Sequence, residues 1–537
     1  MTTKKNKKTD SSHYSFELTS ELKAKGKWEL DDQIFILPQE WMPLNFKKLI
    51  EKVIPQVGMK ELYTADEIIA QYEAKVLSLK KNSQSKVQFL KLYFNTGKVS
   101  CFLFLNEKIS PFELQTELRE NLGSFLSEVL SDSKKTQMGL NLESYSQKSD
   151  SKDVQRVLQS FVFLMHTLLW KPVDFGRRVQ KSSKEKNHFR VRVQASFLSR
   201  ENFRSWVQLS TLQALANNEV RTLAELPANE LTPRAYREHV RKYAQKEGLQ
   251  FEFWNIAELK KRKAGAFLAV ARADQNSEGG IIHLKYSPRS SKKPVLALVG
   301  KGICFDTGGY NIKTGSYMLG MHGDMTGSAL ALALCGLLSR LKVDFEVHAY
   351  LAIAENLISP TAYKPNEVVI ASDGTSIEVV DTDAEGRMIL ADTLVQVRKQ
   401  KPSLAIDFAT LTGAAIRALD TRRSAVFSNR TELLEASVQA GERSGERTWP
   451  FPIGEDYRKE LDSKIADIMQ CASGNNSDHI YAATFLSHFI GEEIPWIHVD
   501  LSSTKNKGGL GLISSQTTGF GVLWAMEFIQ YWMNNKI

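Results

Sequence analysis

The sequence predicts an α/β protein of two domains. The larger, C-terminal domain is expected to have a mostly parallel or mixed central sheet flanked by helices. The chain has 537 residues, more than a single hydrophobic core usually serves. In its second half, strand-like and helix-like runs take turns, which is typical of a largely parallel sheet covered on both faces. We therefore expect a flexible basic tail over residues 1–30, a smaller α/β domain over 31–190 and the larger domain over 191–537.

The smaller domain is predicted from strands and helices that interleave. Residues 86–94 and 99–106 (KVQFLKLYF and VSCFLFLN) are rich in β-branched and aromatic side chains, as strands are. Residues 111–130 and 153–170 have the apolar spacing of amphipathic helices. This half of the chain has no cluster of metal ligands or nucleophiles, so it offers no candidate site.

The larger domain follows a charged stretch at residues 177–192 and a predicted helix at about 200–226. Strands are then expected at QFEFWNIAEL, PVLALVG, DFEVHAYLAIAE, SIEVV and LAIDFATL, and helices at SALALALCGLLSRL and MILADTLVQVRKQ. In such a sheet, binding sites form in loops at the carboxyl ends of the strands. The loops after these strands are therefore the first place to look for chemistry.

Composition favours a cytoplasmic enzyme. The chain is 42% hydrophobic and 24% charged, as in ordinary globular proteins. Its four cysteines follow no CxxC spacing, which fits buried thiols better than a disulfide framework. The basic start lacks a following apolar stretch, and no run of about 18 apolar residues occurs, so neither a signal peptide nor a membrane span is predicted.

The net charge of +9 comes from the N-terminal part of the chain. Residues 1–200 hold 33 Lys and Arg against 23 Asp and Glu, which leaves 37 against 38 for the remainder. A solvated tail and a charged linker explain this excess most simply. A surface for the phosphate backbone of nucleic acids is the alternative.

Three predicted loops of the larger domain gather charged residues and glycines. PVLALVG leads into KGICFDTGGYNIK and then MHGDMTG, SIEVV leads into DTDAEGR, and LAIDFATL leads into TGAA, where Gly413 suggests a tight approach. All three are expected at one edge of the sheet. They supply Lys301, Asp306, Lys313, Asp324, Asp383, Glu385 and Arg387.

Four carboxylates in one buried place need compensation, because an unpaired buried charge costs several kcal/mol. Two divalent cations would balance the charge of Asp306, Asp324, Asp383 and Glu385. Asp383 and Glu385, two apart, would face the same side if that stretch were extended. Hard oxygen ligands without HExxH or cysteines suit Mn²⁺, Mg²⁺, Co²⁺ or Zn²⁺. A network of salt bridges without metal is the alternative that these residues leave open.

Several segments resemble the leucyl aminopeptidase (cytosol aminopeptidase) family. DTDAEGRMILADTL is similar to the family's NTDAEGR signature, and VGKGICFDTGGYNIK and MHGDMTGSA are similar to its metal-binding segments. The resemblance continues in order over about residues 205–525, through LAELPANELTP, AFLAVARA, AENLISPTAYKPNEVV, DFATLTGA, WIHVD and TTGFGV. An ordered series of segments is far more specific than one motif.

The resemblance implies a dinuclear metallo-aminopeptidase in which residues 191–537 form the catalytic domain. Two divalent ions, Mn²⁺ or Zn²⁺, would activate the water that attacks the peptide. Glu385 and Asp306 would bridge them, and Lys301 and Asp324 would complete one site. Asp383 would complete the other. A lysine that binds metal must be neutral, and adjacent dications are what would lower its pKa.

The resemblance also implies the catalytic roles. Lys313 would stay charged and polarise the scissile carbonyl. Arg387 would hold a bicarbonate that acts as general base. The free α-amine of a peptide substrate would bind one metal and Asp324, so that only N-terminal residues are removed. A homohexamer with interior active sites is implied as well. Residues expected to shape the pocket for the first substrate side chain are Met321, Thr410, Leu411 and Gly413.

Departures from the family pattern limit what the resemblance carries over to this chain. Asp381 stands where the family usually has Asn, and CASGNNSDHIY (471–481) differs from a glycine-rich segment. The segment after WIHVD carries Lys505 and Lys507 in place of small and apolar residues. A lysine near the pocket would favour acidic or polar N-terminal residues over leucine.

Two other functions remain as alternatives. One is nucleic-acid binding by the basic N-terminal half, as in some relatives of the family. The other is a non-catalytic assembly subunit, which would be expected to have lost a ligand, Lys313 or Arg387. All of these residues are present.

Overall fold

The structure is a computed structural model that describes residues 14–21, 32–38, 87–93, 99–105, 109–131, 137–142, 151–176, 187–195, 197–276, 278–289, 294–472 and 477–535. The chain divides into two compact units, Met1–Thr211 and Leu212–Ile537. The division falls inside helix α6 (Arg200–Ala224), about twenty residues beyond the boundary expected at residue 190. Most of the charged stretch 177–192 that suggested the earlier boundary lies outside the described residues.

The described part of unit 1 contains a six-stranded sheet and the helices α3 (Pro111–Ser131) and α5 (Ser151–Leu168), which pack on each other. All neighbouring strands are parallel except the last pair, β4 and β3. The order across the sheet is β1 (Tyr14–Glu21), β6 (Asn187–Gln194), β5 (Gln137–Asn141), β2 (Asp32–Pro38), β4 (Val99–Leu105), β3 (Val87–Tyr93).

Strand β1 lies within the tail expected over residues 1–30. The backbone of Tyr14–Glu21 pairs in parallel with β6, from Tyr14 opposite Asn187 to Glu21 opposite Gln194. The physical reason is visible in the sequence YSFELTSE, where apolar and polar residues alternate as in a half-buried strand. The lysine-rich composition around it concealed this short pattern.

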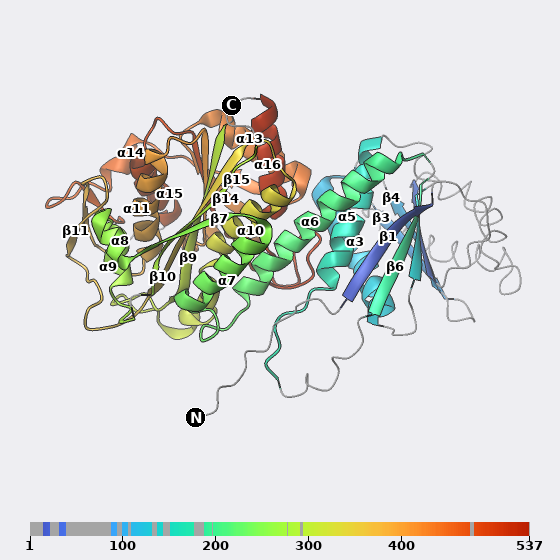
Figure 1. Ribbon diagram of the computed structural model, residues 1–537, viewed down its shortest axis with the longest axis horizontal. Coiled ribbons are helices and arrows are strands. Elements are labelled where there is room, and N and C mark those ends of the chain that lie inside the picture. Colours follow the sequence, from blue (N-terminus) through green and yellow to red (C-terminus); the bar gives the residue numbers. More distant parts are fainter. Residues whose placement is uncertain are drawn as a thin grey trace, which may run out of the picture. The chain divides into compact units, whose positions relative to one another are not determined.

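Unit 2 is built on an eight-stranded mixed sheet whose four central strands are parallel (Figure 1). The edge pairs β10–β8, β8–β7 and β14–β17 are antiparallel, and β14–β15 is parallel. The order is β15 (Thr448–Pro450), β14 (Ser424–Ser428), β17 (Trp496–Asp500), β13 (Leu404–Ala409), β9 (Val295–Asp306), β10 (Glu346–Asn356), β8 (Gly280–Tyr286), β7 (Gln250–Asn255).

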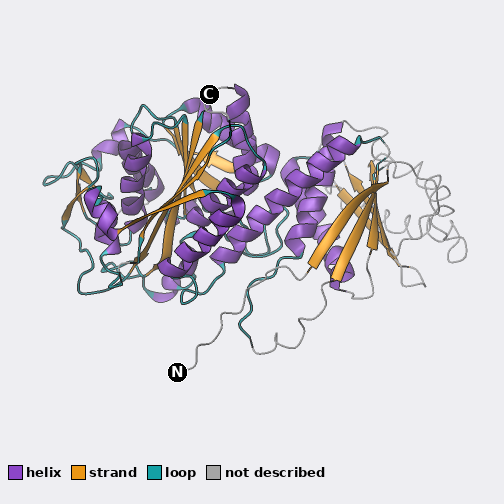
Figure 2. Cartoon of the chain, viewed as in Figure 1, coloured by secondary structure: helices purple, strands orange, loops and turns teal. Residues whose placement is uncertain are grey.

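Helices cover both faces of this sheet, as Figure 2 shows for unit 2. Each layer shares a large cluster of buried apolar side chains with the sheet face that it covers. This confirms the predicted α/β class. One layer contains α7 (Pro233–Glu247), α10 (Thr326–Arg340), α13 (Thr431–Ser444) and α16 (Val522–Asn535); the other contains α8 (Ile256–Lys261), α9 (Gly265–Ala271), α11 (Glu385–Lys399) and α15 (Asp478–Ile490).

Helix α10 approaches the central strands unusually closely. A Cβ atom on Gly327 would lie 2.1 Å from the carbonyl oxygen of Phe408 on β13. A Cβ atom on Gly300 of β9 would lie 2.4 Å from the Cα atom of Ser328. Both positions therefore require glycine. The close packing fixes the start of α10, and with it the residue two positions earlier, Asp324.

Two predicted strands differ in ways that affect the site. Strand β9 continues through KGICFD to Asp306, so Lys301 and Asp306 lie on the strand rather than in the loop after it. The strand in SIEVV, β12 (Ser376–Glu378), belongs to a separate three-stranded sheet with β11 (Val368–Ile370) and β16 (Ile468–Met469). The segment DTDAEGR therefore follows a strand of this separate sheet and not a strand of the main sheet.

Within the described ranges, none of the helices combines the length and apolar character needed to cross a bilayer.

Candidate functional site

Three buried carboxylates meet at the end of the central strand β9. Asp306 is the last residue of β9, Asp324 follows the 3₁₀ turn η5 (Met321–Gly323), and Glu385 is the first residue of α11. One oxygen from each lies within 4.8 Å of the others. All three side chains are almost fully buried. Residues 18 to 79 positions apart in sequence are thus brought into one cluster.

Two lysines lie among these carboxylates. Lys301 Nζ is 2.8 Å from Asp324 Oδ2 and 3.0 Å from Glu385 Oε1. Lys313 Nζ is 2.8 Å from Asp306 Oδ2 and 2.5 Å from Asp383 Oδ1. The structure therefore brings together all five predicted ligands and Lys313, with the ammonium groups in the positions of counter-ions.

Glycines make this proximity possible. A Cβ atom on Gly386, directly after Glu385, would lie 2.7 Å from Cε of Lys301. Gly308 has a φ of +83°, and a Cβ atom there would lie 2.4 Å from the carbonyl oxygen of Asn311. The turn at Gly308 returns the chain so that Lys313 faces Asp306.

Burial and mutual repulsion raise the pKa of several of these carboxyl groups. Burial, followed by the charge of Asp306, raises the pKa of Glu385 to about 8. Burial likewise raises the pKa of Asp324 and of Asp383 to about 6. Burial by itself would lower the pKa of Lys301, but Asp324, Glu385 and Asp306 outweigh it and raise that pKa. Without another cation, the cluster is short of positive charge.

Polar neighbours fix the carboxylates in place. Asn356, at the end of β10, donates from Nδ2 to Asp306 Oδ1 at 2.8 Å and to Glu385 Oε2 at 3.2 Å. Thr410 donates from Oγ1 to Asp324 Oδ1 at 2.7 Å and accepts from Lys301 Nζ through its carbonyl oxygen at 3.0 Å. Sequence reasoning missed Asn356, although its position at the end of a predicted central strand was a usable signal.

The stretch before Glu385 is not extended, so the condition under which Asp383 and Glu385 would face the same side is not met. Asp383 lies in a turn, where its backbone N–H donates to Asp381 Oδ1 at 2.8 Å, and Glu385 already starts α11. The two carboxylates reach the cluster because the chain turns into a helix between them. Asp381 caps this turn and takes no part in the cluster of three carboxylates.

Arg387 is buried and already paired. Its Nη2 donates to both carboxylate oxygens of Asp478, at 2.7 and 2.6 Å, and its Nη1 donates to the carbonyl oxygen of Gln470 at 3.2 Å. Only 1% of the Arg387 side chain is exposed. Nε alone has no hydrogen-bond partner. Sequence reasoning missed Asp478, which lies 91 residues further along the chain.

The predicted pocket residues fall into two groups. Thr410 touches Asp324, Leu411 lies beside Gly386, and half-buried Met321 begins η5, three residues before Asp324. Gly413 differs from expectation because it begins helix α12 (Gly413–Leu419), where a Cβ atom would meet only Arg417 Nη1 at 3.4 Å. A tight backbone approach is therefore not the reason for glycine at 413.

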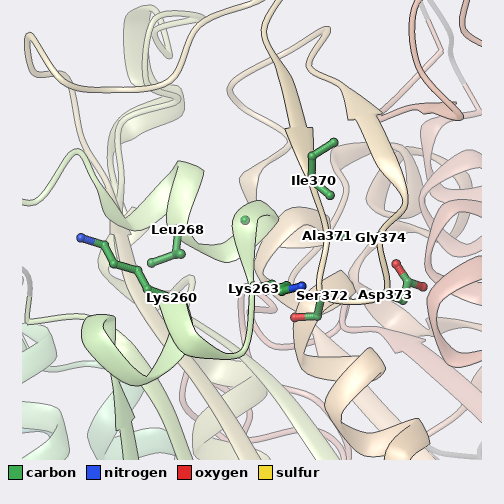
Figure 3. A pocket seen from close by; sticks show the side chains of 9 residues that line it. Lys260, Lys263, Leu268, Ile370, Ala371, Ser372, Asp373 and Gly374 are labelled. Carbon is green, nitrogen blue, oxygen red and sulfur yellow. The ribbon is translucent and has the colours of Figure 1, made fainter.

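A hollow of about 570 Å³ lies elsewhere in unit 2, between α9 and β11 (Figure 3). Its lining includes none of the predicted site residues. The lining residues are Lys260, Lys263, Gly265, Leu268, Ile370, Ala371, Ser372, Asp373 and Gly374.

The donor set fits divalent cations. Carboxylate oxygens of three buried residues lie within 4.8 Å of one another, and the pKa values of Asp324 and Glu385 are raised. Dications would stabilise the ionised form of these carboxylates, because they would displace protons and the lysine ammonium groups. The residues that would hold such ions are Lys301, Asp306, Asp324, Asp383 and Glu385. Cations bound there would face Lys313, the remaining positive side chain.

Comparisons with known proteins agree with this geometry. The profile of the cytosol aminopeptidase family, catalytic domain, matches residues 218–525. A probable cytosol aminopeptidase of Aquifex aeolicus is 35% identical over 351 residues, which are 65% of this chain and 70% of that protein. Leucine aminopeptidase 1 of Arabidopsis thaliana is 41% identical over 321 residues, 58% of this chain and 60% of that protein.

A solved structure of a tomato leucine aminopeptidase mutant superposes with a TM-score of 0.81, covers 98% of both chains and shares 25% of the residues. The profile match spans more than half of the chain and includes the entire carboxylate cluster. The chain therefore belongs to the cytosol aminopeptidase family and is an aminopeptidase by class.

Proposed function

We propose that this chain removes the N-terminal residue of peptides with two divalent cations, Mn²⁺ or Zn²⁺, held by Lys301, Asp306, Asp324, Asp383 and Glu385. The observation that carries the proposal is the meeting of three buried carboxylates within 4.8 Å. The alternative is a permanent salt-bridge network. It is disfavoured because the pKa values of Asp324, Asp383 and Glu385 are raised, so the two lysines do not fully compensate the negative charge of the carboxylates.

The cations would supply Lewis acidity and a water that is acidic enough to attack near neutral pH. The chain's own residues supply the rest. Asn356 holds Asp306 and Glu385 in one orientation, and Thr410 holds Asp324. Lys313 is the more exposed lysine of the cluster, with 14% of its side chain exposed against 4% for Lys301. We assign it the polarisation of the scissile carbonyl, a role in which the charge stabilises the developing oxyanion.

The requirement for a free N-terminus follows from the same charges. The α-ammonium or amine of a peptide would lie beside Asp324, whose carboxylate is already oriented by Thr410. A blocked amine would bring neither charge nor a metal ligand to this position. Met321, Thr410, Leu411 and Gly413 remain the proposed wall for the first substrate side chain.

We also propose that Lys505 shifts specificity toward acidic or polar N-terminal residues. Its Nζ lies 3.3 Å from the carbonyl oxygen of Gly320, directly before Met321. Its charge helps to lower the pKa of the neighbouring His322, after the larger effect of burial. A cation beside Met321 would attract a substrate carboxylate more than it would a leucine side chain.

The experiment that tests the function combines metal analysis with a substrate pair. We expect up to two Mn²⁺ or Zn²⁺ per chain, cleavage of leucine anilide, and no cleavage of the N-acetyl derivative. Glu385→Ala should lose turnover and bound metal, whereas Glu442→Ala, on an exposed helix surface, should retain both. Equal cleavage of the blocked substrate, or full activity of Glu385→Ala, would contradict the proposal.

A further inference from the structure

The guanidinium of Arg387 already holds a carboxylate that belongs to the chain. Asp478 accepts from Nη2 with both oxygens, at 2.7 and 2.6 Å, and these are the short distances of charge-assisted hydrogen bonds. Nη1 is directed to Gln470. The family resemblance places a free bicarbonate on this same guanidinium, so two anions are assigned to one cation.

The contacts leave little to attract a second anion. Asp478 neutralises the charge of Arg387, and the Arg387 side chain is 1% exposed. Nε, the one nitrogen without a partner, offers a single N–H. A bicarbonate would have to displace Asp478 or enter beside its negative charge, and both are unfavourable. The residues therefore do not fit a bicarbonate bound to Arg387.

Asp478 is also held where it is by the fold. It is the first residue of α15, and a carboxylate in the first turn of a helix is stabilised by the positive end of the helix dipole. Because 35% of its side chain is exposed, it remains open to water on one side. The carboxylate thus has two separate sources of positive charge, Arg387 and the helix end.

We propose that Asp478 is a built-in replacement for the bicarbonate, so that turnover by this protein does not require a dissociable anion at Arg387. Asp478 is a positioning residue in this proposal, because it acts through Arg387, which lies two residues after Glu385. The inference rests on the proposed aminopeptidase function for its kinetic readout only. Whether bicarbonate binds is decided without turnover.

The test compares the wild type with Asp478→Ala in carbon-dioxide-free buffer, with and without tens of millimolar bicarbonate. The wild type should change less than twofold in kcat/KM on an aminoacyl anilide. Asp478→Ala should lose at least tenfold without bicarbonate and recover most of that loss with it, because the small side chain leaves Arg387 charged and accessible. Line broadening of ¹³C-bicarbonate in NMR should show saturable binding to Asp478→Ala and none to the wild type.

Asp373→Ala is the matched control, since it also removes the aspartate of an Asp–Arg pair, here with Arg398 at 3.2 Å, away from the carboxylate cluster. It should neither bind bicarbonate nor respond to it. Saturable bicarbonate binding by the wild type would overturn the proposal, as would a folded Asp478→Ala protein that does not bind the anion. A wild type that cleaves no peptide would instead contradict the proposed function, and the NMR result would still decide this inference.

Discussion

At the scale of single residues, Lys313 offers the sharpest separation of metal binding from catalysis. Its ammonium contacts Asp306 and Asp383 without being buried as deeply as Lys301. We expect Lys313→Ala to retain bound metal and to lose about 10²–10³-fold in kcat, the usual effect of removing one group that stabilises an oxyanion. Steady-state kinetics with metal analysis of the same sample would measure both.

The control for this change is Lys399→Ala, at the solvent-facing end of α11, which should leave kcat unchanged. If Lys313→Ala kept full activity, the assignment of this lysine as the electrophile would be wrong. If it lost metal together with activity, Lys313 would be a structural counter-ion of Asp306 and Asp383 instead.

Lys505 leads to a prediction about specificity. Lys505→Met should lower kcat/KM for glutamyl anilide relative to leucyl anilide by about tenfold, because it removes one charge interaction worth about 1.4 kcal/mol with the substrate carboxylate. Lys507→Met, two residues away and exposed, is the control and should leave the ratio unchanged. An unaltered ratio in Lys505→Met would show that this lysine serves only to hold Gly320.

The sequence was informative about residues that carry charge and poor at finding their neutral partners. The five candidate ligands and Lys313 were predicted from charged loops and a family resemblance, and the structure places these side chains together. Asn356, which holds two of the carboxylates, carries no charge to draw attention, so its position at the end of a predicted central strand was the one signal for it. Asp478 was missed since its partner lies 91 residues away and only the folded chain brings them together.

At the scale of secondary-structure elements, the contact of α10 with β9 and β13 positions Asp324. Gly327→Ala would place a Cβ atom 2.1 Å from the carbonyl oxygen of Phe408, so the helix must shift. We expect a loss of about 1–3 kcal/mol in the free energy of unfolding, as overpacking usually causes. Activity should fall as well, because Asp324 moves with the helix.

Gly123→Ala serves as the matched change, since a Cβ atom there, inside helix α3, meets nothing within 4 Å. That substitution should stabilise the protein by about 0.5–1 kcal/mol through helix propensity. Thermal denaturation of both variants gives the comparison. A Gly327→Ala protein as stable and active as the wild type would refute the role given to this contact.

The burial of His166, on helix α5, makes unit 1 sensitive to acid. Burial lowers the pKa of His166 to about 4, below its ordinary value of 6.5, and its Nε2 lies 3.1 Å from Thr211 Oγ1. A lowered folded-state pKa means that the unfolded chain binds a proton first. The contribution of neutral His166 to the free energy of unfolding is therefore fully present above pH 6.5, and it is lost as the pH falls toward 4.

His166→Gln removes this titration. Between pH 7 and pH 4, the wild type should lose about 3 kcal/mol of unfolding free energy relative to the variant. This is the energy that corresponds to a fall in the pKa of His166 from 6.5 to about 4. Denaturant unfolding monitored at several pH values measures it. A difference that does not vary with pH would mean that His166 keeps an ordinary pKa in the folded protein.

Element types were easier to predict than their lengths and partners. The predicted alternation of strands and helices in unit 2 was correct, because the two-residue period of strands and the 3.6-residue period of helices are both strong in the sequence. The length of β9 was underestimated since its glycines, Gly300 and Gly302, look like the beginning of a loop, whereas here they admit α10 and β10. The separate sheet of β12 could not be predicted, because its pairing with β16 joins residues that lie 91 positions apart in the sequence.

At the scale of the whole molecule, the two units differ in what they contribute. All predicted ligands, Lys313, Arg387 and Asp478 lie in unit 2, which also contains the residues matched by the family profile. The excess of positive charge lies within residues 1–200. Nucleic-acid binding therefore stays a separate possibility for the first unit. Glu385→Ala should leave any salt-sensitive binding of duplex DNA unchanged, because that residue lies in the other unit.

The surface of unit 2 bears on assembly. We propose a homohexamer, in keeping with the family resemblance, and exposed apolar side chains give it a physical basis. Tyr317 is 77% exposed, Leu319 is 86% exposed and Ile465 is 63% exposed in the single chain. Exposed apolar side chains that lie together mark contacts with another protein chain, and Tyr317 and Leu319 are two residues apart in the sequence. Sedimentation of the wild type should give about 363 kDa, six times the 60.5 kDa of the chain.

Leu319→Asp should shift this distribution toward smaller species, because burying a leucine gains about 1.5–3 kcal/mol at each contact while burying an unpaired carboxylate costs more. Arg422→Ala, a change at a 72% exposed polar side chain, should leave the mass unchanged. A wild type that sediments as a single chain at micromolar concentration would refute the assembly. A hexameric Leu319→Asp protein with impaired cleavage would instead place Leu319 at the entrance to the site, where it follows Lys313 by six residues.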